Sequence, residues 1–287
     1  MSIPIDQGLV MRHAFNSIFP LLLTGFALVT AGMGCGANGP VQDKLPCSTI
    51  HGLDSLLRPG RIILLGEIHG TQEAPAYVGQ MACHMLRKQI PVIVGLELPR
   101  EEESVVRAFL QSEGSEADQL NILQLPFWAK EYQDGRTSQA MFDLLETLRQ
   151  FRTVGGEIDI LLIDHPSSDN RDIAMAARII QTAKEAPASM MVILTGNLHS
   201  IIYEDSGYMG SYITAALGKD RVLSLKQTFT GGSAWVDTGG SPGPVRFGGE
   251  GLAWKGIIIN PDLYEYQGSF EMDSIHASRP AKEMVAN

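Results

Sequence analysis

The sequence predicts an α/β fold: a single domain with a mostly parallel central sheet and helices on both faces. Short, nearly continuous aliphatic runs recur along the 287 residues, and longer segments with helical spacing separate them. Such runs suit strands that are buried on both faces. Strands that alternate with helices imply right-handed crossovers and a largely parallel sheet. We expect strands at residues 61–66, 91–97, 158–164 and 191–196, with weaker ones at 221–225 and 256–260.

The segments between these runs have apolar residues at helical spacing. Ser167 or Ser168 is suited to cap one of these helices, and Thr137 or Ser138 another. The glycine-rich stretch 231–251 interrupts the alternation and predicts a long surface loop or an irregular hairpin. The expected helices cover residues 75–87, 101–111, 117–123, 138–153 and 169–184.

The amino-terminal region predicts export. Residues 18–34 carry no charge and end in small residues before Cys35, as in a bacterial lipoprotein signal whose cysteine becomes lipidated. Gly32 stands where such a site usually has Leu, so a plain cleaved signal or an uncleaved anchor is the alternative. Arg12 supplies the basic region of a signal only if Met11 is the true start, and the choice between Met1 and Met11 stays open. We therefore expect a lipid-anchored protein of the cell envelope, on the periplasmic side.

The domain boundaries follow from these patterns. We expect a signal peptide at residues 1–34, a small and polar tether at 35–52, the α/β domain at 53–270 and a flexible tail at 271–287. The net charge of −10 argues against a nucleic-acid partner, because phosphate binding needs clustered cations. Cys47 and Cys83 form either a disulfide or two buried free thiols, and both readings stay open.

Polar side chains follow the four strong strands at the points where these strands end. The first strand is followed by Glu67 and His69 and the second ends in Glu97. The third strand ends in Asp164, with His165 directly after it, and the fourth is followed by Asn197 and His199. Ligands of open α/β sheets bind outside the carboxyl ends of the strands. The sequence therefore predicts one shared site.

Spacing suggests the chemistry of this site. Residues two apart on an extended chain point to the same side, so Glu67 and His69 project together, as do Asn197 and His199. A carboxylate that orients an imidazole is the usual arrangement of a general base. The same residues could instead hold Zn, Mn or Co, and they could also be helix caps and hydrogen-bonded core histidines. The candidate metal ligands are Glu67, His69, Glu97 and His199.

Two arginines stand at positions that allow either a site role or a structural role. Arg171 opens a predicted helix, where a cation meets the positive end of the helix dipole. We therefore expect it to bind a substrate carboxylate or oxyanion, or to pair with Glu67 or Glu97. A solvated Arg171 beside Asp172 is the alternative. Arg136 follows a turn signal and, with Trp128, could line a pocket mouth, although structural roles are favoured for both.

The motifs LLGEIHGTQE, VGLELP, DGRTSQAM, RDIAMA and LTGNLHS together carry a family resemblance. Their order, over residues 64–200, resembles the superfamily that unites ChaN-type haem-binding lipoproteins, Tiki/TraB proteases and erythromycin esterases, and is closest to the ChaN-like branch. The resemblance implies a shared fold and a site at Glu67, His69, Glu97 and His199, with Arg171 as a neighbour.

The resemblance implies different activities in its three branches. The Tiki branch implies metal-dependent peptide hydrolysis, and the esterase branch implies a general base acting on water without a firmly bound metal. In Gly-Glu-Ile-His the glutamate and the histidine are one residue closer together than in the esterase pattern Gly-Glu-x-x-His. This difference counts against macrolide hydrolysis. The ChaN branch implies haem or iron capture, although the sequence has no dedicated haem motif.

Two functional hypotheses result. The first is a hydrolase of peptide, ester or amide bonds, in which Glu67 holds His69 as general base. Glu97 and His199 would complete the site, while Arg171 and Asn197 would donate to the oxyanion. The second is a haem- or iron-binding uptake lipoprotein without catalysis. Its candidate cofactor-binding residues are Tyr77 and His165, together with His69 and His199.

Overall fold

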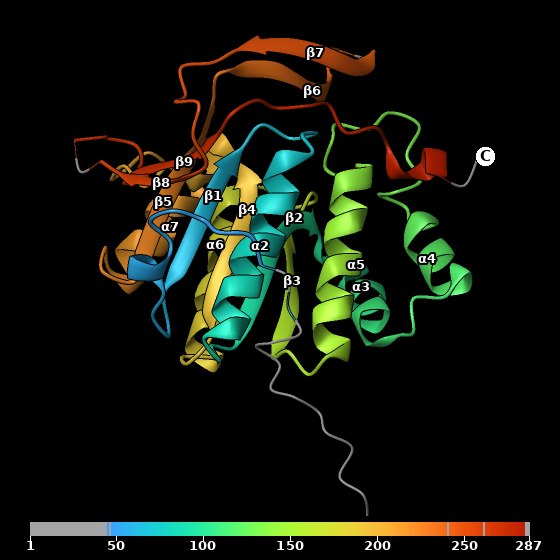
Figure 1. Ribbon diagram of the computed structural model, residues 1–287, viewed down its shortest axis with the longest axis horizontal. Coiled ribbons are helices and arrows are strands. Elements are labelled where there is room, and N and C mark those ends of the chain that lie inside the picture. The colour runs from blue at the N-terminus through green and yellow to red at the C-terminus, as the bar shows by residue number, and fades with distance from the viewer. Residues whose placement is uncertain (1–44, 46, 240, 261, 285–287) are drawn as a thin grey trace, which may run out of the picture. The chain divides into compact units, whose positions relative to one another are not determined.

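A seven-stranded sheet forms the centre of the computed structural model, which describes residues 45, 47–239, 241–260 and 262–284 (Figure 1). The strand order is β3-β2-β4-β1-β5-β9-β8, and every neighbouring pair is parallel except β8 with β9. The predicted mostly parallel sheet is confirmed. Its strands are β1 (Ile62–Glu67), β2 (Val92–Pro99), β3 (Ile158–Asp164), β4 (Met190–Gly196), β5 (Val222–Phe229), β8 (Gly256–Ile259) and β9 (Gly268–Met272).

Helices cover both faces of this sheet, because successive strand residues point to opposite sides. Ile63 and Leu65 of β1 belong to the core under one set of helices, whereas Ile62 and Leu64 belong to the core on the opposite face. The first face carries α2 (Glu73–Arg87), α3 (Glu103–Gln111), α4 (Glu116–Leu123) and α5 (Gln139–Thr153). The second carries α6 (Arg171–Glu185) and α7 (Met209–Leu217).

Short 3-10 helices complete the described elements: η1 (Asp54–Leu56), η2 (Arg100–Glu102), η3 (Asn197–Ser200) and η4 (Ala281–Met284). Ser138 caps α5 as predicted, but α6 is capped by Asn170 and not by Ser167 or Ser168. The sequence patterns did not indicate α7 or β9.

The glycine-rich stretch forms an antiparallel hairpin of β6 (Gly231–Asp237) and β7 (Pro242–Gly248). It lies beyond the carboxyl ends of the parallel strands, at the top of the view in Figure 1. The backbone N–H of Trp235 donates to the carbonyl of Gly70, which follows β1. This hydrogen bond holds the hairpin against the carboxyl-terminal edge of the sheet, where the predicted site residues lie.

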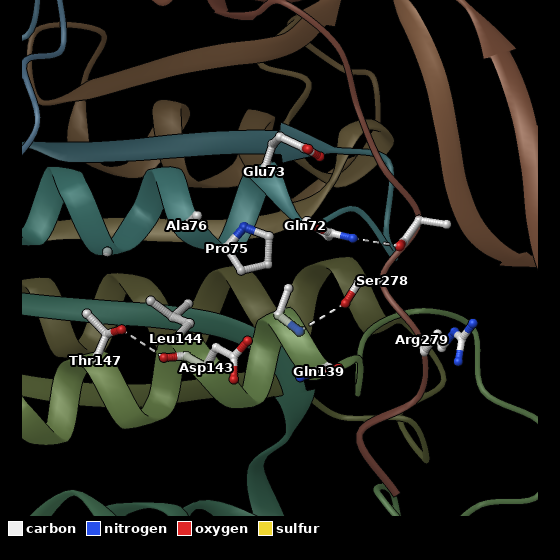
Figure 2. A pocket seen from close by; sticks show the side chains of 13 residues that line it. Gln72, Glu73, Pro75, Ala76, Gln139, Asp143, Leu144, Thr147, Ser278 and Arg279 are labelled. Atoms are coloured by element: carbon white, nitrogen blue, oxygen red, sulfur yellow. Dashed lines mark hydrogen bonds between the residues drawn. The ribbon is translucent and has the colours of Figure 1, made fainter. Parts of the chain in front are cut away.

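The carboxyl-terminal segment differs from the expected flexible tail. Ile275 and Ala281 are fully buried, and Gln72 Nε2 donates to the carbonyl of Ala277 over 3.1 Å. The backbone N–H of Ala140 donates to Ser278 Oγ over 2.9 Å. Figure 2 shows the labelled Gln72 and Ser278 beside the groove of about 710 Å³ between α2 and α5. Residues 271–284 are thus part of the domain, because they bury apolar side chains against it.

The amino-terminal boundary also differs from expectation. Leu45 and Ile50, assigned to the tether, are buried in the core. Cys47 and Cys83 form a disulfide, which ties the leading segment to α2. The predicted signal peptide and the lipidated Cys35 lie outside the described residues. Among the described helices, none has the length and apolar character that crossing a membrane would need.

Candidate functional site

The candidate site lies at the carboxyl ends of β1, β2 and β4. β4 pairs in parallel with both other strands, so all three chains leave the sheet at the same edge. β2 contributes Glu97, the end of β1 contributes Glu67 with the following His69, and η3 after β4 contributes His199. The structure brings these four predicted residues together.

Glu97 is the centre of the cluster, and its side chain is only 5% exposed. Its Oε2 accepts hydrogen bonds from Thr195 Oγ1 and from the backbone N–H of Gly196, both over 2.8 Å. The Nε2 atom of His69 lies 3.6 Å from Oε2, and the Nε2 atom of His199 lies 3.7 Å from Oε1. Two imidazoles therefore face one buried carboxylate, each opposite a different oxygen.

A second carboxylate supports each imidazole from behind. His69 Nδ1 lies 3.0 Å from Glu67 Oε1, and His199 Nδ1 lies 2.8 Å from Asp172 Oδ1. Because a carboxylate accepts the Nδ1 proton, the Nε2 atom of each ring is left to face Glu97. The predicted Glu67–His69 pair is confirmed as a contact. The contact between Asp172 and His199 was not predicted, because the two residues are 27 positions apart in the sequence.

Two guanidinium groups hold the other side of Glu97. Arg136 Nη1 and Arg171 Nη2 each lie 3.2 Å from Glu97 Oε1. Asp164, which is 1% exposed, binds both arginines: Arg136 Nη1 over 3.0 Å and Arg171 Nε over 2.9 Å. Arg136 also forms a bidentate pair with Asp134. The predicted pairing of Arg171 with Glu97 is confirmed, and Arg136 has the same role.

Glycines allow the connecting segments to approach closely. A Cβ atom on Gly66 would lie 2.1 Å from Ser200 Oγ, so only glycine lets η3 fold back against β1. Gly135 has a φ of +94°, and a Cβ there would lie 2.5 Å from the backbone nitrogen of Gly70. These two close approaches place His199 and Arg136 beside Glu97. The Asp-Gly turn in the sequence was therefore a signal for Arg136.

Charge compensation sets the protonation of the cluster. Burial alone would raise the pKa of Glu97, but the positive charges of His69, Arg136 and His199 outweigh it and lower that pKa to about 2. Burial would lower the pKa of His69, yet the charge of Glu97 and the hydrogen bond to Glu67 raise it overall. Burial raises the pKa of Glu67 against the opposing effect of His69. Glu97 is consequently ionised, and His69 is a stronger base than an ordinary histidine.

The donor set does not fit the predicted Zn, Mn or Co site. Arg136 and Arg171 contact Glu97 Oε1, and their positive charges oppose a cation at this carboxylate. Thr195 and Gly196 already occupy Oε2. Within the described part of the chain, no group of three or more His, Cys, Asp or Glu side chains is arranged to hold a metal ion.

The two cofactor-binding candidates do not join the cluster. Tyr77 is 9% exposed and packs against Phe270 in the core, with ring centroids 5.3 Å apart, so it is not at a pocket rim. His165 Nε2 accepts from Arg100 Nη2 over 2.6 Å, at the end of the edge strand β3. Haem binding stays a prediction, and His69 and His199 are the candidate ligands that lie in the site.

Asn197 lies in the site region but not as expected. It begins the 3-10 helix η3, so the strand-like alternation with His199 is wrong. Its backbone carbonyl accepts from Tyr266 OH over 2.9 Å and from Ser200 Oγ over 2.8 Å. These bonds fix the turn that carries His199, and Asn197 is among the residues that line a cavity together with Glu67.

Replacing Arg136 by Met should destabilise the fold, because it leaves Glu97 and Asp164 with one guanidinium between them. We expect the free energy of unfolding in urea to fall by about 3–5 kcal/mol. Lys88→Met is the matched control: it removes an exposed pair with Asp54 and should cost no more than about 1 kcal/mol. A loss from Arg136→Met as small as that of the control would contradict the central role of this ion pair.

No protein-family model and no curated protein matches the sequence. Solved structures do match its fold. A succinoglycan biosynthesis protein superimposes with a TM-score of 0.59 at 9% identity, covering 84% of this chain and 97% of that one. A histidine-to-asparagine variant of the erythromycin esterase EreC in its open conformation matches with a TM-score of 0.53 at 10% identity, covering 77% and 91%.

A haem-binding ChaN from Campylobacter jejuni matches less well, with a TM-score of 0.34 at 11% identity over 61% of this chain and 84% of that one. At these identities the matches concern the fold and not the activity. The sequence motifs and the superposition on EreC agree on the same architecture. The chain therefore shares its fold with the erythromycin esterase EreC.

Proposed function

We propose that this protein is a hydrolase of peptide, ester or amide bonds whose centre is Glu97 with its two flanking histidines. One observation carries the proposal: two imidazoles, each backed by its own carboxylate, direct Nε2 toward opposite oxygens of one buried, ionised glutamate. Packing alone does not require this convergence of titratable groups. Strongly perturbed acids and bases that cluster at a strand edge are typical of catalytic sites.

His69 acts as the general base in this proposal. Its Nδ1–H donates to Glu67, so the neutral ring presents an unprotonated Nε2 to an attacking water. As the water oxygen bonds to the substrate carbonyl carbon, Nε2 takes the water proton. Glu67 and Glu97 then stabilise the imidazolium that forms, as the aspartate does in a Ser-His-Asp triad.

Glu97 orients and does not exchange protons, because a carboxyl with a pKa of about 2 stays ionised at neutral pH. Its two oxygens already accept from Thr195, Gly196, Arg136 and Arg171, so it acts through its charge on the two imidazoles that face it. His199, supported by Asp172, stands on the opposite side to protonate the leaving group. Arg171, whose side chain is 34% exposed, and the Asn197 amide are the proposed donors to the carbonyl oxygen.

Replacing either histidine should abolish most of the activity. We expect His69→Asn and His199→Asn each to lower kcat/KM by about 10²- to 10⁴-fold on p-nitrophenyl esters or fluorogenic peptide amides. His276→Asn is the control, since His276 is 63% exposed and pairs with Glu73 at the start of α2, and neither residue contacts Glu97. Hydrolysis that survives in both site variants, with their folding verified by urea titration, would refute the assignment.

The pH dependence should identify the base. The pKa of His69 is raised above its ordinary value of 6.5, and its active form is the deprotonated one. kcat/KM should therefore rise with pH through an apparent pKa above 6.5. Glu67→Gln removes a group that raises this pKa, so the rise should move to lower pH. A rate that instead falls as pH rises through this pKa would make His69 the acid.

We also propose that the protein is an exported lipoprotein anchored through Cys35. The apolar residues 18–34 and the small residues before Cys35 support it, and the Cys47–Cys83 disulfide suits an oxidising compartment. Radiolabelled palmitate should be incorporated by the full chain expressed in a bacterial host, and Cys35→Ser should remove the label. Cys47→Ser, the control, should retain it. Label that persists without Cys35 would exclude this anchor.

A further inference from the structure

The turns that lead into the parallel strands form a basic surface at one end of the domain. Because β1 to β5 are parallel, the five segments that precede them all lie at the amino-terminal edge of the sheet, the lower edge in Figure 1. These segments hold eight of the chain's 22 lysines and arginines but only three of its 32 acidic residues. We name this surface the basic edge; it consists of residues 57–61, 87–91, 152–157, 184–189 and 218–221.

Most of these cations have no acidic partner within the described part of the chain. Lys88 is the exception: its Nζ lies 3.6 Å from Asp54 Oδ1, and both side chains are more than half exposed. Six of the eight side chains are exposed, and the other two, Arg61 and Arg221, are half-buried. The basic edge therefore presents its charge to whatever lies outside the domain. The eight are Arg58, Arg61, Arg87, Lys88, Arg152, Lys184, Lys219 and Arg221.

Helix ends explain only part of this charge. Arg87, Arg152 and Lys184 lie in the last turns of α2, α5 and α6, where a cation complements the negative end of the helix dipole. Arg58 and Arg61 lie instead in the turn before β1. Burial and, after it, the positive charge of Arg58 lower the pKa of Arg61, so like charges are close together in this turn. Such crowding is not required by the fold.

The turns before β4, β1 and β5 form the continuous centre of the basic edge. The backbone N–H of Gly60 donates to the carbonyl of Ser189 over 3.2 Å, and Arg221 Nε donates to the carbonyl of Gly60 over 3.2 Å. The β3 end is less basic, because the adjoining connection between α3 and α4 carries Glu113 and Glu116. The positive charge is thus concentrated below β1 and its two neighbours.

The leading segment joins the domain at this same end. Cys47 is bonded to Cys83, four residues before Arg87, and the carbonyl of Ser48 accepts from His84 Nε2 over 2.7 Å. Eleven residues separate Cys47 from Cys35, the proposed lipid site. Such a chain spans at most about 40 Å when extended and about 20 Å as a flexible coil. An anchor before Cys47 therefore brings the basic edge toward the bilayer.

The opposite edge of the sheet has the reverse charge. The connections that leave β1 to β4 contain five acidic residues and one base, Arg100, within residues 68–72, 100–102, 165–170 and 197–208. The whole chain has a net charge of −10. An anionic surface consequently repels most of the molecule and attracts it at the basic edge, which selects one orientation.

We propose that the basic edge docks on the anionic phospholipid headgroups of the bilayer that holds the leading segment. The inference rests on the proposed membrane location and is independent of hydrolysis. Each lysine or arginine near an anionic bilayer strengthens association about fivefold. In the docked orientation the carboxyl edge, with Glu97 and its two histidines, faces away from the bilayer. The substrate therefore reaches the site from the aqueous compartment.

Amine acetylation of the full chain, quantified at each lysine by mass spectrometry, tests this docking. The chain is reconstituted on vesicles of phosphatidylcholine alone or of phosphatidylcholine and phosphatidylglycerol in equal parts. The anionic vesicles should lower the acetylation rates of Lys88, Lys184 and Lys219 by about threefold or more. Lys130 and Lys226, which are exposed and lie outside the basic edge, should keep their rates. Concentrated sodium chloride should reverse the protection, because it screens the attraction.

Charge reversal locates the surface. Arg58→Glu combined with Lys219→Glu should abolish the protection of Lys88 and Lys184. Lys130→Glu combined with Lys226→Glu reverses the same number of charges elsewhere and should retain it. All four replaced side chains are exposed, so both variants should unfold in urea as the wild-type protein does. Protection that survives the first pair of substitutions overturns the proposal.

Sedimentation with the vesicles separates the docking surface from the anchor. A chain that sediments with neutral vesicles but gains no protection on anionic ones keeps the anchor and overturns the docking surface. A chain that sediments only with anionic vesicles, with its three lysines protected, supports the docking surface and refutes the anchor. Equal protection on both vesicle types, or protection by duplex DNA in place of anionic vesicles, also overturns the proposal.

Discussion

The buried negative charge of Glu97 is the constraint on which the rest of the site depends. Removing a carboxylate from water costs several kcal/mol unless it is paired and hydrogen-bonded. Glu97 meets this cost with Thr195 and Gly196 of β4 and with two guanidinium groups from two further segments of the chain. The carboxylate thereby couples β2, β4, the turn before α5 and the start of α6. An arrangement held by so many segments keeps the two imidazoles in place.

Arg171 illustrates how this charge organises the local structure. It is the first residue of α6, where the helix dipole disfavours a cation by about 0.3–1 kcal/mol. Asp164 and Glu97 more than offset that cost, because both are almost fully buried and contact the guanidinium directly. The next residue, Asp172, has the charge that the dipole favours, and it supports His199. One helix start thus supplies a cation to Glu97 and an anion to a histidine.

The hairpin and the carboxyl-terminal segment enclose the edge of the sheet that carries the site. A Cβ atom on Gly70 would lie 2.0 Å from the carbonyl oxygen of Trp235, so the loop after β1 and the hairpin are in backbone contact. Ile275 exchanges backbone hydrogen bonds with Gly231 and Ser233 of β6. A cavity lined by Glu67, Phe229 of β5 and Phe247 of the hairpin lies where these segments meet. It depends on the glycine-rich hairpin, a region in which the sequence shows no strand–helix alternation.

The sequence by itself determined the sheet, its largely parallel order and the gathering of Glu67, His69, Glu97 and His199. These features depend on local patterns: aliphatic runs form buried strands, and parallel strands end at one edge. Only the tertiary structure decided that Arg136 also pairs with Glu97 and that Asp172 supports His199. Arg136 reaches the cluster because Gly135 permits a close backbone approach to Gly70, and His199 because Gly66 permits η3 to fold against β1; no periodicity reveals either approach. The same is true of Tyr77, which is buried against Phe270, and of residues 271–284, which are ordered by packing. Contacts between segments distant in the sequence depend on how the backbones meet, and spacing along one segment does not encode that.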